Sequence, residues 1–355
     1  MFDFFKKDKI GQPPWDYYFL QNLAEKDYPK YLAKLFYLNT GEKLPLKFDF
    51  KQGTQVIDKK MCKTFNQKIQ WIKLYGVTDL MRDCTDKVKV RDYVKEKIGE
   101  EYLKPVLQII GACHSENLEN QNVNSVDFQV VQNLTKLQEE KMLIQVQHDS
   151  PTIDFHLVST YFDRINWDKL PNSFVIKTNH GCKWHYIIKN KEEYIKNKRL
   201  INITKEQITD WLSQDYSFYS GFEMQYKGIK PKILIEPLMR ENINKDQSKI
   251  NIYCFNGIPE IIIKFHDDFN MSVWNYRFEP MEFTGKNLKC EADRIIKQTF
   301  DLSKQLAKNF KFVRIDWMIY ENKPYFEEFT FTPYSGFFKF VYNKQNIKLG
   351  CLMSI

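Results

Sequence analysis

Two carboxylates near the end of the chain have the spacing of a divalent-cation site. Residues 312–330 predict two apolar strands joined by a tight Glu-Asn-Lys-Pro turn, in a register that brings Asp316 and Glu328 together. Because side chains alternate along a strand, Glu327 should point to the opposite face. Paired carboxylates suit a Mg²⁺ ion that carries phosphates, since this ion prefers hard oxygen ligands in octahedral geometry. A β-hairpin with an acidic solvent face explains the same residues as well.

Lys87 and Arg91 form a candidate phosphate site at the beginning of a helix predicted over residues 86–98. Their spacing places them on one helical face, near the free N–H groups of the helix N-terminus. A solvated basic face is the commoner explanation for such a pair.

A second cationic group follows a strand predicted over residues 174–178. Lys177 lies on this strand, and His180 and Gly181 belong to the polar loop that follows it. A strand-borne lysine followed by a loop of backbone donors can hold the phosphates of a nucleotide. The chain has no Gly-x-Gly-x-x-Gly and no Walker A motif, so we expect neither a Rossmann nor a P-loop site.

Other polar groups give weaker signals. Glu236 lies in a strand that ends in Glu-Pro, where its carboxylate could accept a hydrogen bond from a ribose hydroxyl, although a glutamate at a strand end is ordinary. His180, Cys182 and His185 lack a fourth ligand, which argues against structural zinc. We interpret residues 266–268, His-Asp-Asp, as a charged loop.

The composition is that of a folded, soluble enzyme-sized chain. Of its 355 residues, 43% are hydrophobic and 15% are aromatic, enough for two or three domains or one large enzyme. The net charge of +8 is spread along the sequence, which suits an anionic substrate but does not indicate nucleic-acid binding. Seven scattered cysteines predict reduced thiols. With no signal peptide and no apolar run of membrane-spanning length, we expect a cytoplasmic protein.

The apolar pattern changes along the chain. Residues 1–115 place apolar side chains at three- and four-residue spacing, which predicts a mainly helical region. Further on, short apolar strands alternate with helices predicted over 205–212 and 292–310, and Phe-Asn-Gly at 255–257 predicts a hairpin turn. We therefore expect an α+β fold with mostly antiparallel sheets in its second half.

Taken in order, these groups resemble the ATP-grasp superfamily, and more closely its TupA-like branch, which is associated with teichuronopeptide and capsular polysaccharide biosynthesis. The resemblance runs from about residue 63 to residue 349, and several motifs in the right order are more specific than any one. The motifs are Thr-Phe-Asn-Gln-Lys-Ile-Gln-Trp at 64–71, Asp-Lys at 86–87, Val-Arg-Asp-Tyr-Val at 90–94, Leu-Pro-Asn-Ser-Phe-Val-Ile-Lys-Thr-Asn-His-Gly at 170–181, Cys-Phe-Asn-Gly at 254–257 and Glu-Phe-Thr-Phe-Thr-Pro at 328–333.

The resemblance implies an ATP-grasp fold in which two α+β subdomains enclose a nucleotide. The expected divisions are a helical N-terminal region (1–115), an insertion and link (116–170), a lid subdomain (171–236) and a C-terminal subdomain with the metal site (237–355).

The resemblance also implies roles for individual residues. The residues it assigns to ATP are Lys87, Lys177, His180, Gly181 and Glu236, and those it assigns to Mg²⁺ are Asp316, Glu328 and Thr330. In this arrangement the two lysines contact phosphates, the loop at 178–184 closes over them, and the glutamate lies at the hinge near adenine and ribose.

The chain departs from the family pattern at two places. Thr330 stands where many ATP-grasp enzymes have an asparagine, as is common in this branch. Lys-Ile-Asn at 249–251 stands where Asp-Tyr-Lys is expected, so one phosphate contact lacks its lysine. Lys264 and Arg277 are the candidates to replace it.

The activity implied is ATP-dependent ligation of a carboxylate to an amine through an acyl phosphate. Arg240 and Arg314 are candidates to hold the carboxylate, because a planar guanidinium can bind it bidentately. Ordinary ion pairs explain both arginines too. The expected substrates are an amine and a uronic acid, such as glucuronate, of a capsular or cell-wall polysaccharide or its precursor.

Two other classes of function are weighed against this one. A glycosyltransferase of polysaccharide biosynthesis would use nucleotide sugars, but the chain has no Asp-x-Asp motif, which many metal-dependent members carry. A basic protein that binds carbohydrate or nucleic acid would need more concentrated positive charge.

Overall fold

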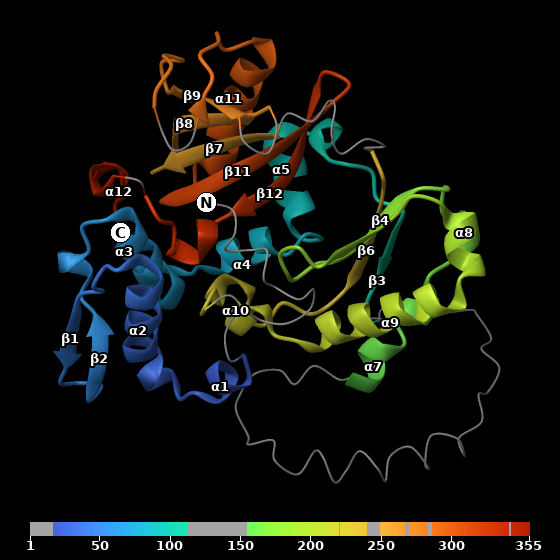
Figure 1. Cartoon of the computed structure of the whole chain (residues 1–355), viewed down its shortest axis with the longest axis horizontal. Helices are drawn as coiled ribbons and strands as arrows, with labels where there is room; N and C mark the ends of the chain where they lie inside the picture. Colours follow the sequence, from blue (N-terminus) through green and yellow to red (C-terminus); the bar gives the residue numbers. More distant parts are fainter. Residues whose placement is uncertain are drawn as a thin grey trace.

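Three β-sheets organise the part of the chain that the structure describes, and helices pack around them (Figure 1). The computed structural model describes residues 17–112, 155–219, 221–239, 249–266, 270–282, 286–340 and 342–355. Its helices and antiparallel strands confirm the predicted α+β class. Much of the predicted insertion and link, residues 113–154, lies outside the described ranges. Within those ranges, no helix combines the length and the apolar character needed to cross a membrane.

The largest sheet has the strand order β10-β9-β8-β7-β11-β12. Its strands are β7 (Lys249–Phe255), β8 (Ile258–Phe265), β9 (Asn270–Asn275), β10 (Lys286–Asn287), β11 (Phe312–Tyr320) and β12 (Lys323–Thr330). Neighbouring strands are antiparallel except β9 and β10. Helix α11 (Arg294–Ala307) covers one face, where its buried side chains share a hydrophobic core with Val313, Ile315 and Trp317 of β11. Alternation along β11 therefore leaves Arg314 and Asp316 on the other face.

Two hairpins in this sheet form as predicted from the sequence. Asn256 and Gly257 join β7 to β8 with φ of 51° and 79°. Glu321 and Asn322 join β11 to β12 with φ of 48° and 57°. Two consecutive left-handed residues are typical of the tight turns whose twist matches that of the flanking strands. The second turn sets the register of β11 and β12 as far as Trp317 and Phe326, where a bulge shifts the pairing by one residue.

The four-stranded sheet has the order β3-β6-β4-β5, and all its neighbours are antiparallel. Its strands are β3 (Gln108–Ile110), β4 (Phe174–Thr178), β5 (His185–Ile188) and β6 (Ile233–Pro237). The helices of this part are α7 (Phe155–Ser159), α8 (Lys191–Lys196), α9 (Lys198–Ser213) and α10 (Tyr216–Tyr219). A second core lies between this sheet and α9 (Figure 1). The strand predictions for β4, β5 and β6 are confirmed, whereas α9 begins earlier than the predicted residue 205.

Between residues 17 and 102, the regular elements are helices and one hairpin. The helices are α1 (Tyr17–Asn22), α2 (Tyr28–Thr40), α3 (Phe65–Trp71), which continues as a π-helix (Ile72–Gly76), α4 (Asp79–Thr85) and α5 (Val90–Ile98), and the hairpin strands are β1 (Leu46–Asp49) and β2 (Thr54–Ile57). Thr64 and Gln67 form a capping box at the start of α3. Short 3-10 turns lie at Glu25–Asp27, Lys59–Met61, Glu100–Tyr102, Phe162–Arg164, Trp167–Lys169, Met224–Tyr226 and Pro333–Gly336. The helices expected from apolar spacing are present, but the hairpin was not predicted.

The helix predicted to begin at residue 86 begins at Val90 instead. Asp86 is the C-cap of α4, and its carboxylate accepts hydrogen bonds from the backbone N–H groups of Val88 and Lys89 at 2.8 and 3.4 Å. This local bonding forms a turn where a helix was expected. Lys87 therefore lies between two helices and does not share a helical face with Arg91.

Helix α12 (Asn343–Leu352) packs directly on the start of α3, which makes Gly350 a test of the fold. A Cβ atom at Gly350 would collide with the carbonyl oxygen of Lys63 and lie 2.9 Å from the backbone nitrogen of Phe65. Because both atoms belong to the backbone, Gly350→Ala should lower the free energy of unfolding by about 1–3 kcal/mol, measured by urea unfolding. The exposed neighbour offers a control, since Cys351→Ala should change it by less than about 0.5 kcal/mol. Equal stability of the two variants would contradict this packing.

Candidate functional site

Charged side chains from the two larger sheets lie near one another in a region that we call the sheet junction, between β4-β6 and β11-β12. Leu103 pairs with Phe326 of β12, while the residues that follow it form the edge strand β3 of the other sheet. The Glu327 carboxylate of β12 also acts electrostatically on Lys104 and on Lys177 of β4. The junction therefore brings together groups that are more than 100 residues apart in the sequence.

Asp316 and Glu328 are direct partners in the register of β11 and β12, as predicted. Asp316 is buried, and it accepts two hydrogen bonds from Arg314, from Nε at 2.7 Å and from Nη2 at 2.5 Å. The Thr330 hydroxyl lies 3.0 Å from Arg314 Nη2 and 3.4 Å from Asp316 Oδ2. Burial raises the pKa of the Asp316 carboxyl to about 6, against the opposing effect of the guanidinium. The four predicted residues thus form one charged cluster.

Glu327 does not point away from this cluster, so that part of the sequence analysis is wrong. The register shifts between Asp316 and Trp317, which leaves Glu327 as an extra residue in β12. A bulge of this kind interrupts the alternation of side chains. Glu327 Oε2 lies 3.4 Å from Lys249 Nζ, and the carboxylate helps to raise the pKa of Asp316. The β11-β12 side of the junction therefore holds three carboxylates instead of two.

On the other sheet, Glu236 is buried between two lysines. Its Oε2 lies 2.6 Å from Lys177 Nζ and 3.4 Å from Lys104 Nζ. Burial alone would raise the pKa of Glu236, but the two lysines lower it to about 2. Burial and the neighbouring Lys104 lower the pKa of Lys177 to about 8. The sequence analysis does not identify Lys104 as a site residue. Its position within the apolar run Leu-Lys-Pro-Val-Leu at 103–107 is the signal that could have indicated a buried lysine.

The loop after β4 is packed against α9 through its histidine. The ring nitrogen Nε2 of His180 lies 3.2 Å from the carbonyl oxygens of both Trp211 and Gln214. Burial, and to a smaller extent the positive charge of Lys87, lower the pKa of His180 to about 3, so the ring is neutral. At Gly181 a Cβ atom would collide with the Trp184 ring, which explains the need for glycine. His180 therefore positions this loop.

Lys87 reaches the same loop, whereas Arg91 does not. The ammonium of Lys87 donates to the carbonyl oxygen of Gly181, and its backbone N–H donates to Asn179 at 3.1 Å. Arg91 Nη2 instead donates to the carbonyl oxygen of Lys104 at 2.9 Å. The structure thus brings Lys87 to the loop that follows β4, and it places Arg91 against the backbone of Lys104.

Neither residue expected to replace the missing family lysine lies at the junction. Lys264 forms an ion pair with Asp293 at 2.8 Å, at the N-terminus of α11 and hence on the opposite face of the sheet. Arg277 lies beyond β9 against the Tyr276 ring. Lys249 and Lys104 are the lysines found there instead. Arg240 and residues 267–268 lie outside the described residues.

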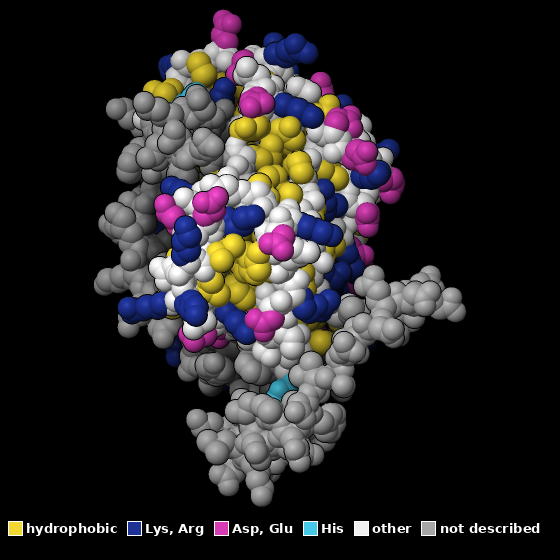
Figure 2. All heavy atoms as spheres, turned by 90° about the vertical axis from the view of Figure 1, so that its right-hand side faces the viewer, with side chains coloured by type: hydrophobic (Ala, Val, Ile, Leu, Met, Phe, Trp, Pro, Cys, Tyr) yellow, Lys and Arg dark blue, Asp and Glu magenta, His cyan; other side chains and the backbone are white. Residues whose placement is uncertain are grey.

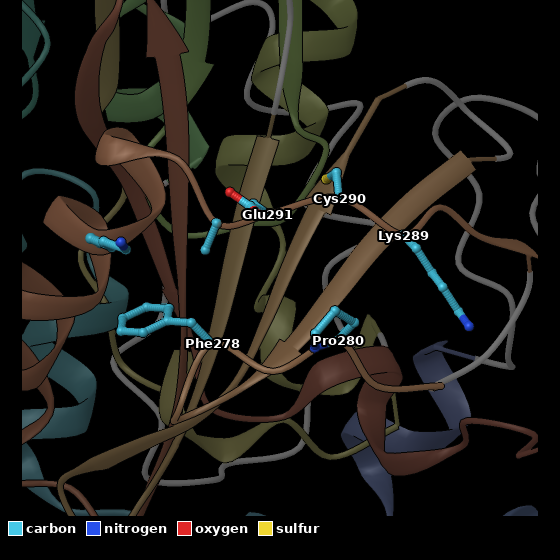
Figure 3. A pocket seen from close by; sticks show the side chains of 7 residues that line it. Phe278, Pro280, Lys289, Cys290 and Glu291 are labelled. Atoms are coloured by element: carbon cyan, nitrogen blue, oxygen red, sulfur yellow. The ribbon is translucent and has the colours of Figure 1, made fainter.

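A cavity of about 450 Å³ lies away from the junction. Phe278 and Pro280 line one side of it, and Cys290 and Glu291 line the other (Figure 3). These residues belong to the β9-β10 edge of the large sheet, four strands away from the carboxylates of β12. The cavity therefore does not belong to the candidate site.

A comparison with protein families gives a decisive match. Residues 116–354 match the family described as TupA-like ATPgrasp. The chain belongs to the TupA-like ATP-grasp family. The match covers two thirds of the chain and every predicted site residue except Lys87 and Arg91, and it confirms the predicted ATP-grasp fold.

Solved structures resemble this TupA-like chain only distantly. It has a TM-score of 0.35 and 14% identity with D-alanine–D-alanine ligase from Bacillus anthracis, complexed with ATP, over 77% of this chain and 64% of that one. With D-alanine–D-alanine ligase from Helicobacter pylori, the TM-score is 0.36 and the identity 13%, over 87% of this chain and 77% of that one. With phosphoribosylglycinamide synthetase from Anaerococcus prevotii, the TM-score is 0.30 and the identity 14%, over 75% of this chain and 48% of that one. These scores are too low to carry an argument. A search of curated proteins found no match.

The buried Glu236 group makes a prediction about stability and pH. At pH 7, Glu236→Gln should lower the free energy of unfolding by about 3–5 kcal/mol, because it leaves Lys104 and Lys177 buried without a counter-ion. Since the folded pKa of about 2 lies below the ordinary value of 4.5, this contribution is complete above pH 4.5 and is lost as the pH falls towards 2. Urea unfolding between pH 3 and 7 should show the difference shrinking on acidification. As a control, Glu206→Gln, at an exposed position, should leave the free energy of unfolding nearly equal to that of wild type at every pH. If the loss of stability in Glu236→Gln did not depend on pH, the lowered pKa assigned to Glu236 would be contradicted.

Proposed function

We propose that the chain is an ATP-dependent ligase that joins a carboxylate to an amine. The observation that supports this most strongly is the arrangement of charge at the sheet junction. One side carries the carboxylates Asp316 and Glu328, and the other carries Lys104 and Lys177 on either side of Glu236. A polyphosphate with its cation needs both kinds of group, at opposite ends of one site.

In this proposal the nucleotide lies between the two sheets. Lys177 and Lys87 contact phosphates, and Lys104 adds a third cation that compensates for the lysine absent at position 251. Glu236 lies at the hinge. On nucleotide binding, its carboxylate gives up a hydrogen bond from a lysine and accepts one from a ribose hydroxyl instead. The loop containing His180 and Gly181 covers the phosphates. Its attachment to α9 through His180 supports this role, because it fixes one end of the loop.

The residues around Asp316 fit a Mg²⁺ ion that is shared with a nucleotide. Among the described residues, no group of three or more histidine, cysteine or acidic side chains is placed to hold a metal alone. Mg²⁺ commonly uses one or two carboxylates and completes its octahedron with phosphate oxygens and water. Asp316 and Glu328, with the Thr330 hydroxyl, match that requirement. A cation held by these residues would neutralise phosphate charge, and Arg314 would share the Asp316 carboxylate with it.

The chain's own residues then account for the chemistry by position and charge. Arg314 orients the acid substrate so that a carboxylate oxygen can attack the γ-phosphorus and release ADP, and Arg240 is a second candidate for this role. The amine then attacks the acyl carbon and displaces phosphate. The loop at 178–184, with Trp184 packed behind it, keeps water away from the acyl phosphate.

We propose a uronic acid, such as glucuronate, as the acid, carried by a capsular or cell-wall polysaccharide or its precursor. The support is the TupA-like family membership together with the position of Arg314 beside the carboxylates. A cytoplasmic location goes with this proposal, since ATP and activated glycan precursors are available there.

Nucleic acid is not a proposed partner. On the face beside the four-stranded sheet, lysines and arginines are interspersed with acidic side chains and with clusters of hydrophobic ones (Figure 2). A nucleic-acid site would instead concentrate positive charge in one stripe or patch.

Glu328→Gln tests the ligase proposal. It should lower ADP release by about 100-fold or more, because it removes one of two carboxylates that hold the cation, and it should leave the melting temperature nearly unchanged. The assay is coupled ADP release with a panel of uronic acids and amines, in which release should depend on both substrates. Glu321→Gln, in the exposed turn of the same hairpin, is the matched control and should keep full activity.

Full activity of Glu328→Gln would contradict the metal assignment. Binding of a UDP-sugar by the wild-type chain, with no affinity for ATP, would contradict the ligase itself and favour a glycosyltransferase.

A further inference from the structure

The charged groups of the sheet junction follow one another along β11. At one end of β11, Met318 pairs with Lys249 of β7. Asp316 comes next and pairs with Glu328 of β12. Arg314 follows at the other end and pairs with Thr330 of β12 and Tyr253 of β7. Two of the lysines that the proposed function assigns to ATP, Lys104 and Lys177, are within electrostatic reach of Glu327, which lies on the Met318 side of Glu328. An acid substrate on the other side of the carboxylates would therefore lie at the Arg314 end.

A strained turn lies at that end. Tyr334 and Ser335, in the turn Pro333–Gly336, have φ of 53° and 52°, in the left-handed region that residues other than glycine rarely adopt. Two such residues in succession are unfavourable, and strain of this kind is concentrated at functional sites. The conformation persists only because surrounding groups impose it.

Two fully buried side chains from α3 and its π-helical extension hold this turn in place. Lys73 Nζ donates to the carbonyl oxygen and to the hydroxyl of Ser335, at 3.0 and 2.9 Å. Gln70 Nε2 donates to the carbonyl oxygens of Ser335 and Gly336, at 3.1 and 2.9 Å. Both side chains have 0% exposure. These hydrogen bonds from the buried side chains fix the backbone of the turn.

The consequence is the placement of Tyr334. Its side chain is 44% exposed, and its ring lies 4.8 Å, centroid to centroid, from that of Phe338. Tyr334 follows Thr330 by four residues, and the Thr330 hydroxyl lies 3.0 Å from Arg314 Nη2. The Tyr334 hydroxyl also acts electrostatically on the same guanidinium. An accessible aromatic ring is therefore held beside the cation that is proposed to bind the acid.

We propose that Tyr334 is a specificity-determining residue that contacts the ring of a sugar acid whose carboxylate is bound by Arg314. A pyranose has an apolar C–H face, which an aromatic ring can remove from water, and a carboxylate beside it meets the guanidinium. An acid without a ring would make only the second contact. This inference rests on the proposed function, because it assumes that the acid lies at the Arg314 end.

The test separates binding from stability. Wild type, Tyr334→Gly and Tyr334→Phe, each as the full chain, are titrated calorimetrically with sodium D-glucuronate, with sodium acetate and with the ATP analogue AMP-PNP in the presence of Mg²⁺. Tyr334→Gly should bind glucuronate at least tenfold more weakly, with acetate and AMP-PNP unchanged. Its melting temperature should be equal to or above that of wild type, because glycine adopts a left-handed φ without strain. Tyr334→Phe should keep glucuronate affinity within about threefold.

Tyr276→Gly is the matched control, because Tyr276 has the same 44% exposure but lies at the far edge of the large sheet. It should leave glucuronate binding unchanged. Wild-type affinity for glucuronate in Tyr334→Gly would overturn the inference, and so would binding of AMP-PNP but not of glucuronate by the wild-type chain. Failure of the wild-type chain to bind AMP-PNP would instead overturn the proposed function.

Discussion

A buried carboxylate must either find a cation or give up its charge, and Asp316 keeps its charge through two hydrogen bonds from Arg314. Across the sheet junction, Glu236 does the same with Lys177 and Lys104. Each side of the junction is thus internally paired. Binding of a nucleotide and its cation would exchange these partners for phosphate and metal, so that the charges are already in position before the ligand arrives.

The hydrophobic core behind the large sheet keeps this arrangement in register. Trp317 follows Asp316, is fully buried against α11, and donates to the Ser303 hydroxyl at 2.8 Å. This packing fixes which face of β11 carries Arg314 and Asp316. On the other face, Gln70 and Lys73 impose the strained turn beside Arg314. Residues of the N-terminal part of the chain therefore support the candidate site, although the family match begins only at residue 116.

The parts of the site that depend on local patterns could be predicted from the sequence. The two strands and their two-residue turn follow from local patterns, but strict pairing from this turn would place Asp316 opposite Glu327, and the bulge at Glu327 brings Glu328 there instead. The position of Glu327 could not be predicted, because a bulge is set by tertiary packing and changes the alternation by one residue. Lys104 was missed for a related reason, since its partner Glu236 is more than 100 residues away. The sequence predicts a helix start at Asp86, but the hydrogen bonds that its carboxylate accepts from the backbone favour a turn.

The most direct test is a crystal structure of the full chain with Mg²⁺ and a non-hydrolysable ATP analogue. The account predicts phosphates between Lys177 and the carboxylates, a metal ion bound to Asp316 and Glu328, and Glu236 bonded to the ribose instead of to a lysine. A nucleotide bound elsewhere, such as in the cavity beside Phe278, with the Asp316 and Glu236 pairs unchanged, would contradict it.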